Sequence, residues 1–144
     1  MRLSLQTDYA LRLLMFLAAN DGHHSIAEIS QCYGISKNHM MKVAQRLVAE
    51  GFITSVRGRS GGLLLNQPAE KINVGNVVRK FEDTSSFVDC FNVTGKGCIV
   101  SPVCGLQHVL ADGITAFMQH LDGFSVADLI GDKNAFQSVL KAEA

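Results

Sequence analysis

The fold is decided by residues 25–66, SIAEISQCYGISKNHMMKVAQRLVAEGFITSVRGRSGGLLLN. The motif SIAE (25–28) is a capping box and predicts the start of a short helix. Gly34 suits the left-handed residue that follows a helix, and Ser36 suits the N-cap of a second helix over residues 37–50. Two helices joined by so tight a turn indicate a helix-turn-helix, whose second helix is the recognition helix for DNA.

The end of this stretch, FITSVRGRSGGLLLN (52–66), predicts a β-hairpin with a flexible cationic tip. A basic hairpin directly after a helix-turn-helix is the wing of a winged-helix domain, and an ordinary surface hairpin is the alternative. Glycines let the backbone approach the sugar-phosphate wall, while arginines bind phosphates or enter a narrow minor groove. The residues predicted to contact DNA are Ser36, Lys37, Asn38, His39, Lys42, Arg57, Arg59 and Ser60.

Charges are segregated along the chain although the formal net charge is zero. Residues 1–36 carry two basic and three acidic groups, residues 37–80 carry eight basic and two acidic groups, and residues 81–144 carry three basic and eight acidic groups. The basic middle segment therefore predicts one face that binds a polyanion, here a double-stranded DNA operator. Solvated surface charge without a partner is the alternative.

Further helices are predicted on both sides of the winged helix. Thr7 suits an N-cap, and the apolar residues after it predict a largely buried helix over residues 7–19. Residues 74–81 predict a short helix. After Pro102, apolar residues keep three- and four-residue spacing over a long helix, at Leu106, Val109, Leu110, Ile114, Phe117, Met118 and Leu121. We expect the chain from about Asp132 to be a frayed tail.

The long helix has an apolar stripe that the remaining chain is too small to cover. In a small DNA-binding protein such a helix is usually the dimer interface, because a twofold-symmetric operator needs a twofold-symmetric protein; packing against the first helix is the competing account. The predicted fold is mainly α with a small β-hairpin. It comprises a winged helix-turn-helix DNA-binding domain over residues 1–82, a cysteine loop over residues 83–104, and a dimerisation helix with a C-terminal tail over residues 105–144.

Other classes of protein are disfavoured by what the sequence lacks. We find no secretory leader and no apolar run near the roughly 18 residues of a membrane span, so we expect a cytoplasmic protein without a membrane partner. No phosphate-binding glycine motif and no nucleophile with an evident base is present. We therefore expect no enzyme and no catalytic residue.

Three of the four cysteines, Cys90, Cys98 and Cys104, lie in the segment CFNVTGKGCIVSPVC (90–104), whose glycines and proline exclude a regular helix or strand. In a reducing cytoplasm such a cluster indicates metal or redox chemistry more often than disulfides. Its spacings of seven and five intervening residues differ from the C-x-x-C pairs of structural zinc sites. Longer loops suit an iron–sulfur cluster, in which each cysteine binds a different corner.

Three cysteines leave one corner of such a cluster open. Its ligand could be solvent, a small molecule, an acidic residue from elsewhere, or His108, which lies one helical turn beyond Cys104. A reversible disulfide, a zinc ion or inert buried thiols are the alternatives to a cluster. The remaining cysteine, Cys32, is expected to pack against apolar neighbours rather than to bind a metal.

The segments LQTDYALRLLMFLA (5–18), YGISKNHMMKVAQRL (33–47) and VRGRSGGLLL (56–65), with the three downstream cysteines, resemble a family of bacterial winged-helix regulators that includes IscR and NsrR. The resemblance covers nearly the whole chain, and LDGFSVADLI (121–130) is most similar to the NsrR members. It implies a homodimeric transcription repressor with an oxygen-tolerant 4Fe-4S cluster, a 2Fe-2S cluster being the alternative. Nitrosylation of that cluster by nitric oxide would release the repressor from promoters of nitric-oxide stress genes.

The resemblance also implies a set of cluster ligands: Cys90, Cys98 and Cys104 from one subunit, and Asp8 of the partner subunit. The sequence departs from the family in the longer spacing between Cys90 and Cys98, and in His108, which lies one position later than the histidine that binds the cluster in IscR-like members. Three other functions remain open: a metal-free thiol/disulfide switch that regulates transcription, a regulator of cluster assembly like IscR, and an iron–sulfur carrier without a DNA role.

Overall fold

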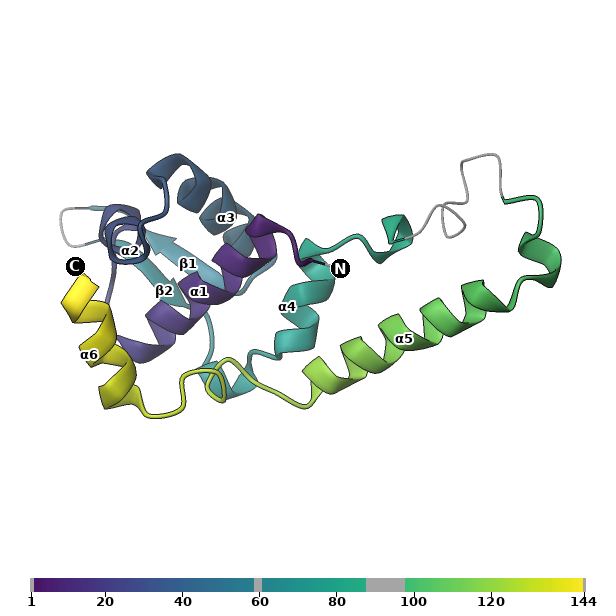
Figure 1. The fold of residues 1–144 in the computed structure, drawn as a ribbon. Helices are drawn as coiled ribbons and strands as arrows, with labels where there is room; N and C mark the ends of the chain where they lie inside the picture. The colour runs from purple at the N-terminus through teal and green to yellow at the C-terminus, as the bar shows by residue number, and fades with distance from the viewer. Residues whose placement is uncertain (1, 59–60, 88–97, 144) are drawn as a thin grey trace.

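The computed structural model describes residues 2–58, 61–87 and 98–143. Its main elements, in chain order, are α1 Leu5–Ala19, α2 Ile26–Tyr33, α3 Lys37–Ala49, β1 Ile53–Val56, β2 Gly62–Leu65, α4 Val74–Phe81, α5 Gly105–Asp122 and α6 Lys133–Glu143. Figure 1 shows a body that contains α1, α2, α3, α6 and the two strands, and an arm, α5, that projects away from it. None of the helices in the described ranges combines the length and apolar character needed to span a membrane.

The helix-turn-helix and the hairpin are confirmed. Ser25 and Ser36 cap α2 and α3, and Gly34 takes the left-handed conformation between them, with φ of 61°. The strands pair antiparallel from Ile53 opposite Leu65 to Val56 opposite Gly62. The confirmed elements give a winged-helix fold that is mainly α with one small hairpin.

A third chain segment joins this hairpin. His24 exchanges two backbone hydrogen bonds with Leu63, of 3.1 and 2.8 Å, and so extends the sheet by one bridge. A Cβ on Gly62 would lie 2.8 Å from the His24 backbone, so only glycine permits this approach. The start of β2, next to the turn of the wing, is thereby fixed to the loop between α1 and α2.

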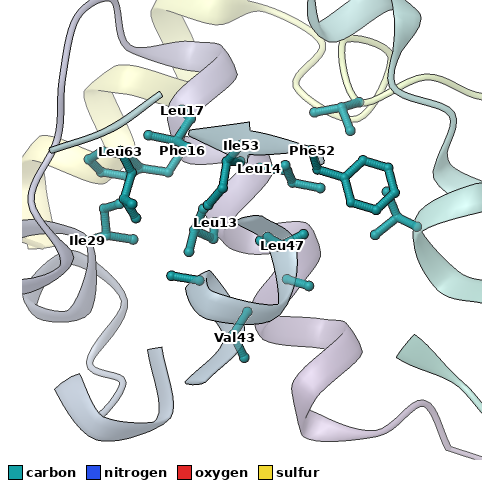
Figure 2. Packing of buried hydrophobic residues seen from close by; sticks show 14 of the residues in the cluster. Leu13, Leu14, Phe16, Leu17, Ile29, Val43, Leu47, Phe52, Ile53 and Leu63 are labelled. Atoms are coloured by element: carbon teal, nitrogen blue, oxygen red, sulfur yellow. The ribbon is translucent and has the colours of Figure 1, made fainter. Parts of the chain in front are cut away.

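The core lies between α1, α2, α3 and the hairpin, as Figure 2 shows. Among the described elements, α1 contributes the largest share of the core, because its apolar residues follow one another with few polar interruptions. The buried side chains labelled in Figure 2 are Leu13, Leu14, Phe16, Leu17, Ile29, Val43, Leu47, Phe52, Ile53 and Leu63. Burying a side chain of this kind contributes about 1.5–3 kcal/mol, so the core holds the recognition helix firmly in place.

Helix α4 confirms the predicted helix over residues 74–81 and joins the body to the arm. Val77 and Phe81 belong to the main core, whereas Val74 and Val78 form a second cluster with Met118 of α5. Only the C-terminal half of α5 takes part in this cluster. The half that follows Cys104 therefore extends beyond the body.

The end of the arm is held on α4 by polar contacts. The Arg79 guanidinium donates to both carboxylate oxygens of Asp122, at 2.5 and 2.6 Å, and Asn73 Nδ2 donates to the Asp122 carbonyl at 2.7 Å. A Cβ on Gly75 would lie 2.1 Å from Asp122 Oδ1, so a glycine in α4 makes room for this carboxylate. The close crossing of α4 and α5 depends on that space.

The prediction of a frayed C-terminal tail was wrong, because residues 133–143 form helix α6. Asp132 caps it by accepting from the backbone N–H groups of Asn134 and Ala135. The helix packs on the body, where Gln137 Nε2 donates to the Ala19 carbonyl at 2.5 Å and Cys32 Sγ donates to the Leu140 carbonyl at 3.4 Å. Cys32 thus has the packing role that the sequence predicted.

Helix α1 begins earlier than predicted, and Thr7 is not its N-cap. Ser4 caps the helix by accepting from the Thr7 N–H at 3.2 Å, and Thr7 is fully buried. Glu82, just after α4, accepts hydrogen bonds from the Thr7 hydroxyl and from the Ser4 N–H. Partial burial would raise the pKa of Glu82, but these hydrogen bonds outweigh it and lower the pKa below its ordinary value of 4.5.

We expect Glu82→Ala to lower the free energy of unfolding by about 1 kcal/mol or more, because Ser4 and Thr7 lose their acceptor. Glu82→Gln keeps an uncharged acceptor and should cost less. The pKa of Glu82 is lowered in the folded protein. The extra free energy of unfolding that the carboxylate gives over the amide is therefore present above pH 4.5 and is lost as the pH falls below it. Urea unfolding at neutral and acidic pH measures this, and a wild-type advantage over Glu82→Gln that does not shrink in acid would contradict the assignment.

Candidate DNA-binding surface and metal centre

Helix α3, the predicted recognition helix, buries one face and exposes the other. Met40, Val43, Ala44 and Leu47 are buried against the core. The predicted contact residues Ser36, Lys37, Asn38, His39 and Lys42 are all exposed, and the Ser36 hydroxyl caps the helix by accepting from the His39 N–H at 3.3 Å. All five predicted residues are therefore accessible at the start of α3.

One of these side chains is oriented by the first helix. The His39 ring stacks on the ring of Tyr9 in α1, with centroids 6.3 Å apart and planes inclined by 30°. Sequence reasoning missed this contact because nothing in the sequence relates residues thirty positions apart on two different helices. The start of α1 consequently lies beside the start of the recognition helix.

The wing turns sharply at its glycines. Gly58 adopts φ of 121°, and the Gly61 N–H donates to its carbonyl at 3.1 Å. A Cβ on Gly61 would lie 2.1 Å from the Val56 carbonyl oxygen, so this turn requires glycine. Arg57 is exposed at the end of β1. The other two predicted wing contacts, Arg59 and Ser60, lie outside the described residues.

Several basic side chains of residues 37–80 contact other groups of the protein. Arg46 lies 4.5 Å from the centroid of the Phe81 ring and donates to the Lys80 carbonyl, while Lys80 Nζ lies 2.8 Å from Glu50. Arg79 pairs with Asp122. By contrast, Lys37, Lys42 and Arg57 are exposed and form no ion pair with another residue of the described ranges. These three cations are thus available to DNA phosphates.

The candidate metal ligands lie at the far end of the arm. Cys104 occupies the N-cap position of α5, is half-buried and makes no capping hydrogen bond through its side chain. Cys98 is exposed, both cysteines are free thiols, and His108 is exposed in the first turns of α5. Cys90 lies outside the described residues. Two of the three predicted cysteine ligands are therefore accessible at the start of an 18-residue helix.

Asp8 lies elsewhere, in the first turn of α1. Its carboxylate is 41% exposed and pairs with Arg12 one turn later, at 3.0 Å between Oδ2 and Nε. The Arg12 carbonyl accepts a hydrogen bond from the Tyr33 hydroxyl at 3.1 Å. Burial and, to a smaller extent, the Cys32 thiol raise the pKa of Tyr33 to about 12, so this hydroxyl keeps its proton at neutral pH.

Asp8 does not form a site with Cys98 and Cys104 of the same chain. Figure 1 shows the start of α5 at the tip of the arm, away from α1. Ten residues separate Cys104 from Ile114, where α5 joins the cluster on α4, which corresponds to about 15 Å of helix. Within residues 2–58, 61–87 and 98–143, no three His, Cys, Asp or Glu side chains are grouped closely enough to bind a metal ion.

The donor chemistry at the arm tip fits an iron–sulfur cluster. Thiolates are the soft ligands that such clusters use, and Cys98 and Cys104 supply two of them from one short segment. The N-terminus of α5 also favours negative charge, because its first backbone N–H groups have no partners within the helix. A negatively charged thiolate cluster would be stabilised in that position.

Comparison with known proteins identifies the family. The family model of Rrf2, described as an iron-dependent transcriptional regulator, matches residues 3–132. The chain belongs to the Rrf2 family. The HTH-type transcriptional regulator NsrR of Bacillus subtilis is 46% identical over 143 residues, which cover 98% of both chains, and NsrR of Bacillus licheniformis is 41% identical over 97% of this chain and 99% of its own.

Solved structures of Rrf2 proteins have the same fold. The oxidized form of CymR from Staphylococcus aureus superposes with a TM-score of 0.73 at 25% identity, covering 92% of this chain and 98% of CymR. IscR of T. potens has a TM-score of 0.71 at 22% identity, covering 90% of this chain and 85% of IscR. The predicted winged-helix fold is thus confirmed, and the chain is a DNA-binding transcriptional regulator of an iron-dependent family rather than an enzyme.

We expect Arg57→Gln to weaken binding to a DNA duplex and to reduce its salt dependence. Each lost phosphate contact should lower the slope of log K against log salt by about 0.9 in magnitude. Fluorescence anisotropy over a salt series measures both quantities. Arg79→Gln is the matched control, because its guanidinium is paired with Asp122 and should leave the slope unchanged. Equal slopes for Arg57→Gln and the wild type would contradict the role of the wing.

Proposed function

We propose that this Rrf2 regulator is a transcription repressor that senses nitric oxide through an iron–sulfur cluster of the 4Fe-4S type. The full-length similarity to NsrR relatives carries the proposal. Two free thiols at the exposed tip of the arm support it, since a signal that is a small diffusing molecule must reach the metal. In this arrangement Cys90, Cys98 and Cys104 hold the cluster, which when bound supplies iron that reacts with nitric oxide.

The functional unit that we propose is a homodimer formed through the arms. The tip of the arm exposes several apolar side chains, with Ile99 95%, Val103 87%, Leu106 62% and Val109 67% exposed. Beside it lies a groove of about 690 Å³ between α5 and the start of the chain, lined by Leu3, Phe87, Val109, Ile114 and Phe117 among others. A second copy that laid its arm along this groove would remove both apolar surfaces from water.

Such a dimer can supply the fourth cluster ligand, which the described residues of one chain do not bring to its arm tip. We propose that Asp8 of the partner subunit completes the site, in place of His108. The Asp8 carboxylate is accessible and already oriented by Arg12, so little ordering is needed for it to bind a metal. A carboxylate is also a hard ligand and binds iron less strongly than a thiolate does. That corner is therefore where we place the entry of nitric oxide.

The proposed ligand lies next to the DNA-binding surface. Asp8 is followed by Tyr9, whose ring stacks on His39 at the start of α3. A change at Asp8 is thus one residue away from a contact with the recognition helix. Loss of the metal ligand on one subunit would release α1 of the other, and we propose that this displaces α3 from the operator.

Protein purified without oxygen should contain iron and sulfide and should bind a twofold-symmetric operator. Addition of nitric oxide should abolish the iron–sulfur absorption and release the DNA in parallel, as followed by absorption and anisotropy on one sample. The operator comes from selection on a random duplex pool. Release by peroxide or a disulfide reagent from a sample without iron would instead establish the metal-free thiol switch, and DNA binding that is indifferent to nitric oxide would refute the proposal.

The trans ligand can be tested with mixed dimers. Asp8→Ala leaves a chain its cysteines, and Cys98→Ser leaves a chain its carboxylate. Each variant alone should lose the cluster or bind it weakly. If Asp8 acts across the dimer, a mixture of the two contains heterodimers with one complete site and should recover part of the wild-type spectrum.

Ligation within one chain predicts no recovery in that mixture, so the outcome separates the two arrangements. Arg12→Gln is the control, because it removes the ion pair of Asp8 but keeps the carboxylate. This variant should retain the cluster. Circular dichroism and sedimentation establish that every variant is folded and dimeric before spectra are compared.

A further inference from the structure

Two apolar side chains lie on the exposed part of α3, Met41 in its first half and Val48 near its end. Lys37, Asn38, Lys42 and Gln45 are exposed on α3, and Met41 lies among them with 41% of its surface exposed. The preceding Met40 is completely buried. The helix therefore directs one methionine into the core and presents its neighbour to the surface on which the DNA contacts are predicted.

When α3 lies in the major groove, Met41 faces the edges of the base pairs together with its polar neighbours. The major groove offers mainly hydrogen-bond donors and acceptors, and its one apolar group is the 5-methyl of thymine. Lys37 and Lys42 flank Met41 with positive charge, which favours a nucleic acid over an apolar protein surface as the partner. Among the four bases, thymine therefore presents the group that suits the Met41 side chain.

We propose that Met41 determines sequence specificity by packing on the methyl group of a thymine in each half-site of the operator. The proposal rests on the role of α3 as the recognition helix, but it does not depend on nitric-oxide sensing. Asn38 and Gln45 lie three residues before and four residues after Met41, so they occupy the same exposed stripe. Their amides can bind adenines, so we expect the thymine that contacts Met41 to be flanked by other A·T pairs.

Replacement of thymine by deoxyuridine removes the methyl group and leaves every hydrogen bond of the base pair in place. The full-length protein first selects its operator from a random duplex pool, and each thymine of a half-site is then replaced in turn. We expect one position to weaken wild-type binding about fourfold per half-site, the factor for about 0.8 kcal/mol from one buried methyl group. Fluorescence anisotropy without nitric oxide gives the dissociation constants.

The matching protein variant is Met41→Ala. It should bind the thymine and deoxyuridine duplexes equally well, because the side chain that contacts the methyl group is gone. Met41→Leu keeps an apolar side chain and should restore the difference in part. The matched control is Val48→Ala, which removes another exposed apolar side chain of the same helix, 40% exposed, and should keep the wild-type sensitivity to deoxyuridine.

Several outcomes would overturn the proposal. They are a selected half-site without thymine, no position sensitive to deoxyuridine, or an undiminished sensitivity in Met41→Ala. The variant Asn38→Ala shows whether only the role of Met41 is wrong or the assignment of α3 as the recognition helix is wrong. If Asn38→Ala changes the selected sequence and Met41→Ala does not, α3 recognises DNA without the methionine; if neither changes it, the assignment of α3 is wrong.

Discussion

The arrangement of this protein depends on the packing of one short helix on two sides. Val77 and Phe81 of α4 lie in the main core, while Val74 and Val78 form the second cluster with Met118 of the arm. An eight-residue helix is too short to be stable alone, so these two apolar surfaces hold it in place. Because both surfaces belong to the same rigid element, the orientation of the arm is tied to the orientation of the body.

The same helix also contacts two of the body elements that carry predicted functional residues, α1 and α3. Its end contacts α3 through Arg46 and the Lys80–Glu50 pair, and Glu82 binds the start of α1. The exposed ion pairs among these contacts contribute little energy each, and their role is to fix orientation. Buried apolar packing supplies the stability. The cysteine arm, the Asp8 helix and the recognition helix are therefore coupled through α4 over short distances.

Local sequence patterns predicted the elements that depend on local chemistry. Ser36 before α3 and the glycines of the wing act through hydrogen bonds and backbone angles within a few residues, and they were recognised correctly. The wrong predictions concern residues whose structure depends on a partner far away in the sequence. Thr7 is buried and donates to Glu82, and α6 is stable because Leu140 packs against the core and Gln137 donates to the Ala19 carbonyl. Neither partner is visible in the local sequence.

The candidate metal site shows the same difference between what local sequence patterns predict and what distant partners decide. The spacing of Cys90, Cys98 and Cys104 indicates a metal but cannot indicate which chain completes it, because a fourth ligand from another subunit has no sequence neighbour. Cys98 and Cys104 lie at the tip of an arm whose apolar side chains are exposed in the single chain. In the proposed dimer, cluster binding and subunit association stabilise each other, since each provides contacts that the other needs. Loss of the cluster then weakens the dimer as well as the site. Reaction with nitric oxide can thus release DNA both by displacing α3 and by weakening subunit association.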